Sequence, residues 1–365
     1  MAAADAAYME RALALAAKGR GLTSPNPMVG AVLVKGGRVV GEGYHRTAGR
    51  DHAEVVAIKK ARGRSRGATL YITLEPCCHT GCTGPCTEAI IAAGVKRVVY
   101  AVKDPDPRVN GKGARTLRRA GIDVSGGLMR MQARRLNEQF FGYHENGRPF
   151  IVVKCAQSLD GRIATVSGDS QWITNLKSRR LAHQLRSEVD AVLVGSGTVR
   201  HDDPALTVRL VKGRDPYRIV VTSDMKLPRR SQVLRNNKDG RTIVAAAGKH
   251  DGRPLVRRGS PIIFWQLKRT RDGLVDVTDL VRKADLFGLR SLLVEGGARL
   301  VTSFIRAGLV DKLVVVTAPL IIGSGVDSIG DLAIRRLADA MRFERYSFDA
   351  SDGDCVFVGY PRRKG

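Results

Sequence analysis

The sequence predicts an α/β protein of two domains, one over residues 1–146 and one over residues 147–365. The chain has 365 residues, whereas a single domain usually has about 100–200. Short β-rich runs alternate with helical stretches, which is typical of a sheet covered by helices on both faces. The alternation stops at a polar segment with glycine and proline, Tyr143–Pro149, and then begins again. We therefore interpret this segment as the linker.

The first domain is expected to contain a hairpin, alternating helices and strands, and a mixed sheet. Two extended runs flank Gly36-Gly37, a pair that favours a tight hairpin turn. Pro85 suits the first turn of a helix, and Gly121 suits the position just after one. Helices are predicted over Met9–Lys18, His52–Ala61, Pro85–Ala93, Gly111–Ala120 and Met129–Phe141, and strands over Met28–Lys35, Arg38–Tyr44, Thr69–Thr73 and Lys96–Val102.

The second domain repeats the alternation with more strands. Helices are predicted over Leu176–Glu188, Val281–Leu286 and Ala298–Ala307. Strands are predicted over Phe150–Ala156, Asp190–Gly195, Arg218–Thr222, Thr242–Ala247, Pro261–Gln266, Ser291–Val294, Lys312–Thr317 and Cys355–Gly359.

The formal net charge is +26, which allows two interpretations. A basic protein can bind nucleic acid by neutralising phosphates. It can also simply be soluble and attract phosphorylated small molecules. The arginines and lysines are scattered along the chain rather than gathered in one arm. We favour the second interpretation for that reason.

The sequence shows no feature that would direct the chain to a membrane or out of the cell. No run approaches the ~20 apolar residues of a membrane helix. The first residues lack a basic segment followed by an apolar one, and the early Asp5 and Glu10 are atypical of a transit peptide. We expect a cytoplasmic enzyme.

The cysteines are clustered rather than spread, which favours metal binding or catalysis over a disulfide framework. Four of the six fall within ten residues, and the full set is Cys77, Cys78, Cys82, Cys86, Cys155 and Cys355.

His52, Glu54, Cys77 and Cys86 form the strongest pattern in the chain. One imidazole and two thiolates suit zinc and leave a fourth position for water. A glutamate two residues after the histidine can take a proton from that water and pass it to leaving ammonia. Zinc deaminases carry this His-x-Glu and Pro-Cys signature. The first domain is therefore predicted to deaminate an aminopyrimidine-type ring.

The spacing leaves the choice of cysteine ligands open. Eight residues separate Cys77 from Cys86, whereas the short deaminase motif has two. Cys78, His79 and Cys82 lie between them and could replace a ligand. The alternative is a purely structural zinc site or a group of buried free thiols. A structural site would use four protein ligands and would not need a glutamate.

Two glycine-containing turns in the second domain follow predicted strands, Gly195–Thr198 and Glu295–Gly297. Such turns bring backbone N–H groups against phosphates, so a phosphate-bearing cofactor or substrate is expected. Each turn alone is weak evidence, because glycine at a strand end is often only a turn. Neither matches the dinucleotide fingerprint of the Rossmann fold.

Together these stretches resemble the bifunctional riboflavin-biosynthesis deaminase/reductase family. The resemblance runs from about Tyr8 to about Gly359. It rests on SPNPMVGAVLV (24–34), GEGYH (41–45), HAE (52–54), TLEPC (73–77), GPC (84–86), IIAAGVKRVV (90–99), DPDPRVNGKG (104–113), SLDGRIA (158–164), SGDSQWIT (167–174), DDPALTVR (202–209) and VEGG (294–297).

The resemblance implies a cytidine-deaminase-like three-layer first domain with a mixed sheet. In that family the long spacing between the cysteines is normal. It implies His52, Cys77 and Cys86 as zinc ligands and Glu54 as proton shuttle. Asn26 and His45 match positions that line the deaminase pocket. The alternatives without a role in the pocket are that Asn26 is a turn residue and that His45 is a surface residue.

The resemblance implies a dihydrofolate-reductase-like second domain that uses NADPH. The positions that match cofactor-binding residues are Ala156, Trp172, Thr198, Asp202, Ser223, Gly297, Ala298, Arg299, Leu300, Val301, Thr302 and Ser303. Those that match substrate-binding residues are Lys154, Ser170, Arg186, Leu206, Arg209 and Glu295. A guanidinium pairs well with phosphate oxygens, which suits the two arginines. Alternatively, Arg186 lies on a solvated helix face and Arg209 is a charge at a strand edge. Trp172 could be a core residue instead of a cofactor contact.

The function implied is deamination of 2,5-diamino-6-(5-phosphoribosylamino)pyrimidin-4-one, followed by reduction of the ribosyl group of 5-amino-6-(5-phosphoribosylamino)uracil to ribityl. The implied partners are phosphorylated pyrimidines, with no membrane, no nucleic acid and a homo-oligomer of this chain. Two alternatives stay open from the residues: a nucleic-acid deaminase with an appended binding domain, and a zinc-stabilised scaffold without activity.

Overall fold

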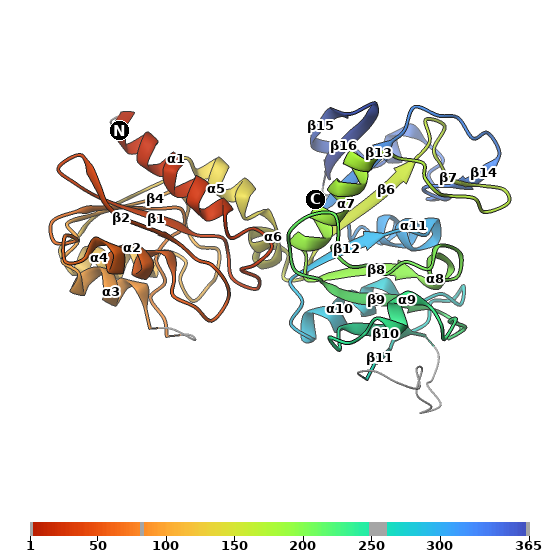
Figure 1. Ribbon diagram of the computed structural model, residues 1–365, viewed down its shortest axis with the longest axis horizontal. Helices are drawn as coiled ribbons and strands as arrows, with labels where there is room; N and C mark the ends of the chain where they lie inside the picture. The colour runs from red at the N-terminus through yellow and green to blue at the C-terminus, as the bar shows by residue number, and fades with distance from the viewer. Residues whose placement is uncertain (1–2, 81–83, 248–260, 363–365) are drawn as a thin grey trace. The chain divides into compact units, whose positions relative to one another are not determined.

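The computed structural model describes residues 3–80, 84–247 and 261–362. The chain forms two compact units that divide between Gly147 and Arg148, one residue after the expected boundary (Figure 1). In the described ranges, every helix is too short or too polar to cross a membrane.

The first unit is built on a five-stranded sheet in the order β2-β1-β3-β4-β5. β1 runs antiparallel to β2 and β3, whereas β3, β4 and β5 are parallel, so the predicted mixed sheet is confirmed. The β1–β2 hairpin turns at Gly36-Gly37, as expected. The strands are β1 (Gly30–Lys35), β2 (Arg38–Tyr44), β3 (Thr69–Ile72), β4 (Arg97–Tyr100) and β5 (Asp123–Gly126).

Helices cover both faces of this sheet (Figure 1). One apolar core joins the sheet to α2, α3 and α4, and a second joins its other face to α1, α5 and α6. The helices are α1 (Ala3–Ala17), α2 (Ala53–Ala61), α3 (Cys86–Ala92), α4 (Lys112–Arg119), α5 (Arg130–Leu136) and α6 (Glu138–Asn146).

Small residues let two of these helices approach the sheet closely. A Cβ at Gly30 would lie 2.0 Å from the carbonyl oxygen of Ala12 in α1. A Cβ at Gly41 would lie 2.2 Å from the carbonyl oxygen of Ala57 in α2. The glycines are therefore required by packing, and α2, which follows His52, is held directly against β2.

The end of the first unit differs from the prediction. The single helix expected over Met129–Phe141 is broken at Asn137, and the linker expected over Tyr143–Pro149 is helical as far as Asn146. The buried Asn137 side chain accepts from the N–H of Met28 at 2.7 Å and donates to its carbonyl at 2.9 Å. This tertiary contact explains the break. Gly147, at φ +63, ends α6.

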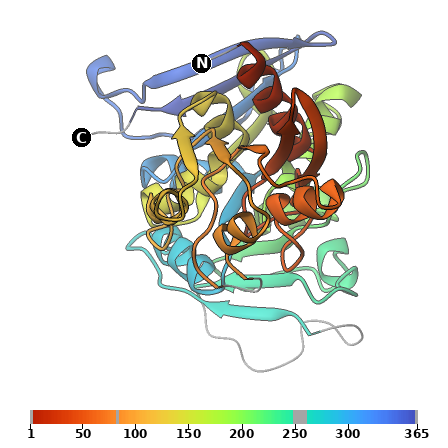
Figure 2. The ribbon, with the colours of Figure 1, turned by 90° about the vertical axis from the view of Figure 1, so that its left-hand side faces the viewer.

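The second unit contains a nine-stranded sheet in the order β11-β10-β9-β8-β12-β6-β13-β16-β15. Its strands are parallel from β11 to β13, and a long antiparallel hairpin forms one edge (Figure 2). The strands are β6 (Phe150–Gln157), β8 (Ala191–Gly195), β9 (Tyr217–Thr222), β10 (Thr242–Ala246), β11 (Ile263–Gln266), β12 (Ser291–Glu295), β13 (Lys312–Thr317), β15 (Phe343–Ser351) and β16 (Asp354–Pro361).

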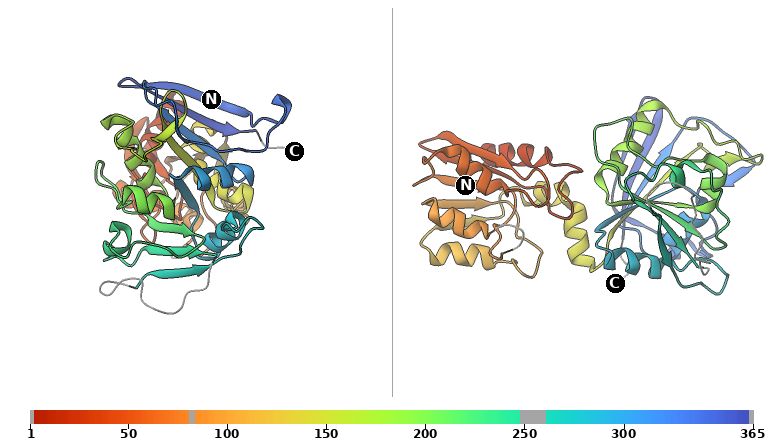
Figure 3. Two further views of the ribbon diagram at one scale, coloured as in Figure 1. Left: turned by 90° about the vertical axis from the view of Figure 1, so that its right-hand side faces the viewer. Right: turned by 60° about the horizontal axis from the view of Figure 1, so that its bottom comes forward.

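Helices lie on both faces of this sheet (Figure 3). One apolar core joins the sheet to α10 and α11, and another joins its other face to α7 with parts of α8 and α9. The helices are α7 (Leu176–Glu188), α8 (Ser196–Asp202), α9 (Gln232–Arg235), α10 (Val277–Leu286) and α11 (Ala298–Arg306), with a short 3₁₀ turn at Leu337–Asp339.

Several elements of the second unit are absent from the sequence prediction. They are α8, α9, β15 and a separate two-stranded sheet made of β7 (Arg162–Thr165) and β14 (Gly325–Asp327). The helix expected over Val281–Leu286 begins earlier, because Asp276 caps it by accepting from Thr278 N–H and Asp279 N–H. β15 is exposed on both faces along most of its length, so it lacks the alternating burial that marks a strand in sequence.

Candidate functional sites

The first site lies where three segments of the first unit meet. His52 is the residue that precedes α2, Cys77 lies in the loop after β3, and Cys86 is the first residue of α3. Their ligand atoms all lie within 4.8 Å of one another. His52 Nδ1 is 3.1 Å from Cys86 Sγ and 3.6 Å from Cys77 Sγ.

This donor set fits zinc. With Zn–N of ~2.0 Å and Zn–S of ~2.3 Å, a tetrahedral ion separates nitrogen and sulfur ligands by roughly 3.5 Å. The distance from His52 Nδ1 to Cys77 Sγ matches this separation, and the distance to Cys86 Sγ is shorter than it. Three protein ligands leave the fourth position open, as in catalytic rather than structural zinc sites.

A hydrogen bond between Cys77 and Cys86 shifts the pKa values of the two thiols in opposite directions. The hydrogen bond from the Cys86 thiol, supported by His52, lowers the pKa of Cys77 to about 4. The same bond and burial raise the pKa of Cys86. The backbone N–H of Cys86 also donates to Cys77 Sγ at 3.4 Å. Cys77 is therefore a thiolate at neutral pH, which is the form that a metal requires.

Glu54 lies in the first turn of α2, and its side chain is buried beside this cluster. Burial, together with the negative charge of Cys77, raises its pKa to about 7. Its carboxyl group also hydrogen-bonds the Cys86 thiol. A carboxyl group that titrates near neutrality can both accept and release a proton.

His45 lies next to His52, and Asn26 contacts His45. The rings of His45 and His52 meet edge to face with centroids 5.2 Å apart. Asn26 Nδ2 is 3.1 Å from His45 Nε2, and His45 Nδ1 is 3.1 Å from the carbonyl oxygen of Asp51. His45 is 2% exposed and burial lowers its pKa, so the surface-histidine alternative is wrong.

The other candidate ligands lie apart or outside the described residues. Cys78 Sγ contacts the carbonyl oxygen of Arg108 at 3.7 Å and does not belong to the described metal-ligating group. Cys82 lies outside the described residues.

Glu75, two residues before Cys77, is a site residue that the sequence analysis missed. Its buried carboxylate accepts from the backbone N–H groups of Gly111 at 2.8 Å and Ala114 at 3.0 Å. A Cβ at Gly113 would lie 2.0 Å from the carbonyl oxygen of Pro76. The segment DPDPRVNGKG therefore packs on the loop that carries Cys77. In the sequence, only the position of Glu75 two residues before a metal ligand could have indicated that it belongs to the site.

The second site lies at the carboxyl ends of four neighbouring parallel strands. In sheet order these are β9, β8, β12 and β6, which end near Ser223, Thr198, Glu295 and Ala156. Ligands of open α/β sheets bind at this edge. Up to 139 positions separate these residues along the chain. The parallel sheet brings the strand ends that carry them to one edge.

The two glycine turns of the second domain meet at this edge. Gly296 and Gly297 have φ values of +95° and +79°, which only glycine adopts readily. A Cβ at Gly297 would lie 3.2 Å from Thr198 Oγ1. By contrast, Cβ atoms at Gly195 and Gly197 would meet no atom within 4 Å in the part of the chain that the structure describes.

Lys154, Arg186 and Glu295 form a charged group on the face covered by α7. Lys154 and Glu295 are register partners on β6 and β12. Arg186 Nε donates to Glu295 Oε2 at 2.6 Å, and both side chains are largely buried, so the solvated-face alternative for Arg186 is wrong. Burial lowers the pKa of Lys154. Glu295 Oε1 is buried without a hydrogen-bond partner in the described chain.

The remaining predicted residues are partly brought together. Ser170 Oγ donates to Asp202 Oδ1 at 3.0 Å. Trp172 is 67% exposed with the guanidinium of Arg179 stacked 4.3 Å from its ring centre, so the core alternative is wrong. Leu206 is buried in the core.

In the run 297–303, most side chains either pack in the core or hydrogen-bond within α11. Leu300 and Val301 pack in the core, and Thr302 Oγ1 donates to the carbonyl of Ala298. Ser303 Oγ donates to the carbonyl of Arg299. The side chains of 300–302 are therefore turned away from solvent, whereas Gly297 and Ala298 are half-buried and Arg299 is exposed.

Comparisons with known proteins define the class. Residues 2–102 match the cytidine and deoxycytidylate deaminase zinc-binding region, and residues 149–357 match the RibD C-terminal domain. The chain is thus a zinc-binding deaminase joined to a reductase domain of the type that uses NADPH. The expected cytidine-deaminase-like and dihydrofolate-reductase-like folds are confirmed.

Full-length relatives give the family. The chain is 45% identical to riboflavin biosynthesis protein RibD of Aquifex aeolicus, over 96% of this chain and 97% of the relative. It is 42% identical to RibD of Escherichia coli K12, over 93% and 95%. The chain belongs to the RibD family of bifunctional riboflavin-biosynthesis proteins.

Two solved structures are similar over nearly the whole chain. Acinetobacter baumannii RibD, form 1, has a TM-score of 0.88 at 34% identity and covers 99% of both chains. A Thermotoga maritima diaminohydroxyphosphoribosylaminopyrimidine deaminase/5-amino-6-(5-phosphoribosylamino)uracil reductase has a TM-score of 0.84 at 35% identity, over 98% of this chain and 99% of the other. The match across both units decides against a nucleic-acid deaminase with an appended binding domain and against an inert scaffold.

Proposed function

We propose that this chain carries out two consecutive steps on a phosphorylated pyrimidine. It removes ammonia from 2,5-diamino-6-(5-phosphoribosylamino)pyrimidin-4-one, and it then reduces the ribosyl group of the resulting 5-amino-6-(5-phosphoribosylamino)uracil to ribityl. The observation that carries the proposal is the buried Glu54 carboxyl group beside the His52–Cys77–Cys86 donor set.

In the deaminase site, His52 Nδ1 and the sulfur atoms of Cys77 and Cys86 would hold zinc, which would supply an activated water at the remaining position. The water oxygen first adds to the ring carbon, and Glu54 moves one of the water protons to the adjacent ring nitrogen. Glu54 then moves the remaining hydroxyl proton to the amino nitrogen as the C–N bond breaks, so ammonia leaves and a carbonyl remains. Asn26 and His45 orient the ring beside His52.

In the reductase site, NADPH supplies the hydride. The open turn at Gly195–Thr198 and the turn at Gly297 receive its phosphates through backbone N–H groups. Ala156, Trp172, Asp202 and Ser223 contribute the remaining cofactor contacts.

The reductase substrate lies on the α7 side of the sheet. The unpartnered Oε1 of Glu295 accepts a hydrogen bond from a sugar hydroxyl, with Lys154 beside it. Ser170 completes this part of the site, and the buried Leu206 supports it from the core. The exposed Arg209 pairs with the substrate phosphate, whereas Arg186 holds Glu295.

The test separates the two activities in one protein. A Glu54→Gln variant should release ammonia about 1,000-fold more slowly than the parent. It should reduce the deaminated substrate at the parent rate and contain the parent amount of zinc. Parent-rate ammonia release by this variant would overturn the role of Glu54. Absence of NADPH oxidation by the parent would overturn the second step.

We further propose that the enzyme acts in the cytoplasm as a homo-oligomer and binds no nucleic acid. The net charge of +26 would then serve to attract the phosphorylated substrates. Binding to RNA that weakens steeply with added salt would contradict this. Light scattering from the purified protein measures the oligomeric state.

A further inference from the structure

The segment that carries Leu206 and Arg209 lies between α8 and β9 and belongs to no helix or strand. Three consecutive residues of this segment each have a backbone group held by a side chain from elsewhere. These contacts fix the main chain that carries the exposed Arg209 side chain, whose Nη1 donates to Thr207 Oγ1 at 2.7 Å.

Two of the contacts come from α7. Arg186 Nη1 donates to the carbonyl oxygen of Thr207 at 3.3 Å. The backbone N–H of Arg209 donates to His183 Nδ1 at 3.0 Å. His183 and Arg186 are three residues apart, so they lie on the same side of the helix.

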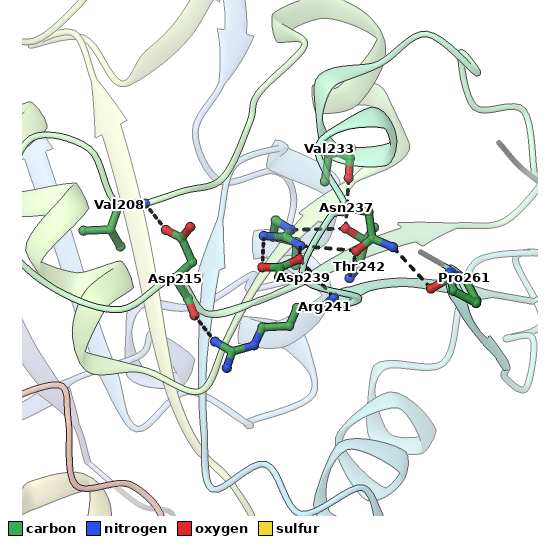
Figure 4. A network of polar contacts seen from close by, with 9 residues as sticks. Val208, Asp215, Val233, Asn237, Asp239, Arg241, Thr242 and Pro261 are labelled. Carbon is green, nitrogen blue, oxygen red and sulfur yellow. Dashed lines mark hydrogen bonds and ion pairs between the residues drawn. The ribbon is translucent and has the colours of Figure 1, made fainter. Parts of the chain in front are cut away.

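The third contact ties the segment to the start of β9. The backbone N–H of Val208 donates to Asp215 Oδ1 at 2.6 Å (Figure 4). Arg241 Nη1 donates to the carbonyl oxygen of Asp215 at 2.8 Å, which joins it to the start of β10. The segment is therefore held from α7 on one side and from the β9–β10 region on the other.

His183 can accept the hydrogen bond from the backbone N–H of Arg209 only as a neutral imidazole, because Nδ1 must then carry no proton. The side chain is 6% exposed. Burial, followed by the charges of Arg186 and Arg209, lowers its pKa to about 4. The ring therefore stays neutral at physiological pH, with its proton on Nε2.

We propose that His183 is a positioning residue for the reductase: its neutral ring holds the main chain of Arg209 and so aims the exposed guanidinium at the substrate phosphate. The inference rests on the proposed function, since it takes Arg209 as the phosphate partner. The imidazole itself touches neither substrate nor cofactor in this role.

Three variants at one position test the role. Asparagine places an acceptor oxygen near the position of Nδ1, glutamine places it one bond farther out, and leucine has none. His183→Asn should keep the parent KM for the deaminated substrate. His183→Gln and His183→Leu should raise that KM about tenfold, as expected when a buried N–H loses its acceptor. The KM for NADPH and the rate of ammonia release should stay at parent values in all three.

Gln184→Leu is the matched control, because Gln184 is an exposed neighbour on α7. This variant should leave the KM for the deaminated substrate, the KM for NADPH and the rate of ammonia release unchanged. If the leucine variant does not fold, the asparagine and glutamine pair carries the comparison. A parent KM in His183→Gln, or an equal loss in His183→Asn and His183→Gln, would overturn the inference. A parent protein that does not oxidise NADPH would instead overturn the proposed function.

Discussion

Glu295 and Lys154 occupy the same register position on adjacent parallel strands, β12 and β6. Arg186 of α7 completes the group by donating to Glu295 Oε2 at 2.6 Å. The second carboxylate oxygen is buried and has no hydrogen-bond partner in the described chain. An unpartnered buried oxygen is costly unless something binds it, which is the reason for placing the substrate here.

Substitution of Glu295 should show how strongly the pair with Arg186 stabilises the second unit. Glu295→Leu leaves a buried guanidinium without its partner and should lower the free energy of unfolding by ~3 kcal/mol. Glu295→Gln keeps an acceptor and should cost ~1 kcal/mol. Urea unfolding measures both. Asp331→Leu, in an exposed pair with Arg335, is the control and should unfold like the parent.

Zinc removal should divide the two activities. Dialysis against a chelator should abolish ammonia release, because the water at the open position is no longer activated. NADPH oxidation with the deaminated substrate should continue in the same sample and serve as the internal control. Added zinc should restore ammonia release. Full ammonia release from protein shown to be metal-free would contradict the assignment.

Gly197→Val should weaken NADPH binding without affecting stability. A Cβ at this position meets no atom of the described residues within 4 Å, so the first carbon of the side chain has room. The same space is where the cofactor phosphates are proposed to lie, so the KM for NADPH should rise about tenfold. Steady-state kinetics and thermal unfolding together check this. A parent KM would place the cofactor elsewhere.

Gly30→Ala should destabilise the first unit, because the new methyl group would lie 2.0 Å from the carbonyl oxygen of Ala12. Pushing α1 away from β1 should cost ~3 kcal/mol, as in other overpacked cores. Gly197→Ala is the same substitution in open space and should cost much less. Thermal unfolding of the two variants measures the difference in stability, and equal losses in both would contradict the close approach of α1 to β1.

The stability of the second unit should fall in acid because of His183. Its pKa is about 4 in the folded protein, below the usual 6.5. The unfolded chain therefore takes up a proton below pH 6.5 while the folded protein does not, and the unfolding free energy decreases between pH 6.5 and 4. The groups that act on the ring are Arg186, Arg209, Glu295 and Asp215. His183→Asn should flatten this part of the stability curve, and identical curves for parent and variant would contradict the low pKa.

The elements that could be predicted from sequence are those with strong local patterns. The hairpin at Gly36-Gly37 and the strands rich in valine and isoleucine carry their own signals. The break at Asn137 could not be foreseen, because it follows from hydrogen bonds to Met28, which lies 109 residues away. β15 was missed since neither of its faces is buried.

The sequence by itself determined the chemistry of the first site, because His52, Glu54 and the cysteines are reactive residue types at a recognisable spacing. Only the tertiary structure decided which sulfur atoms meet the imidazole and that His183 and Asp215 hold the segment of Arg209. Such contacts join residues far apart in the chain. They depend on how the sheets bring strand ends and helix faces together, which no local pattern records.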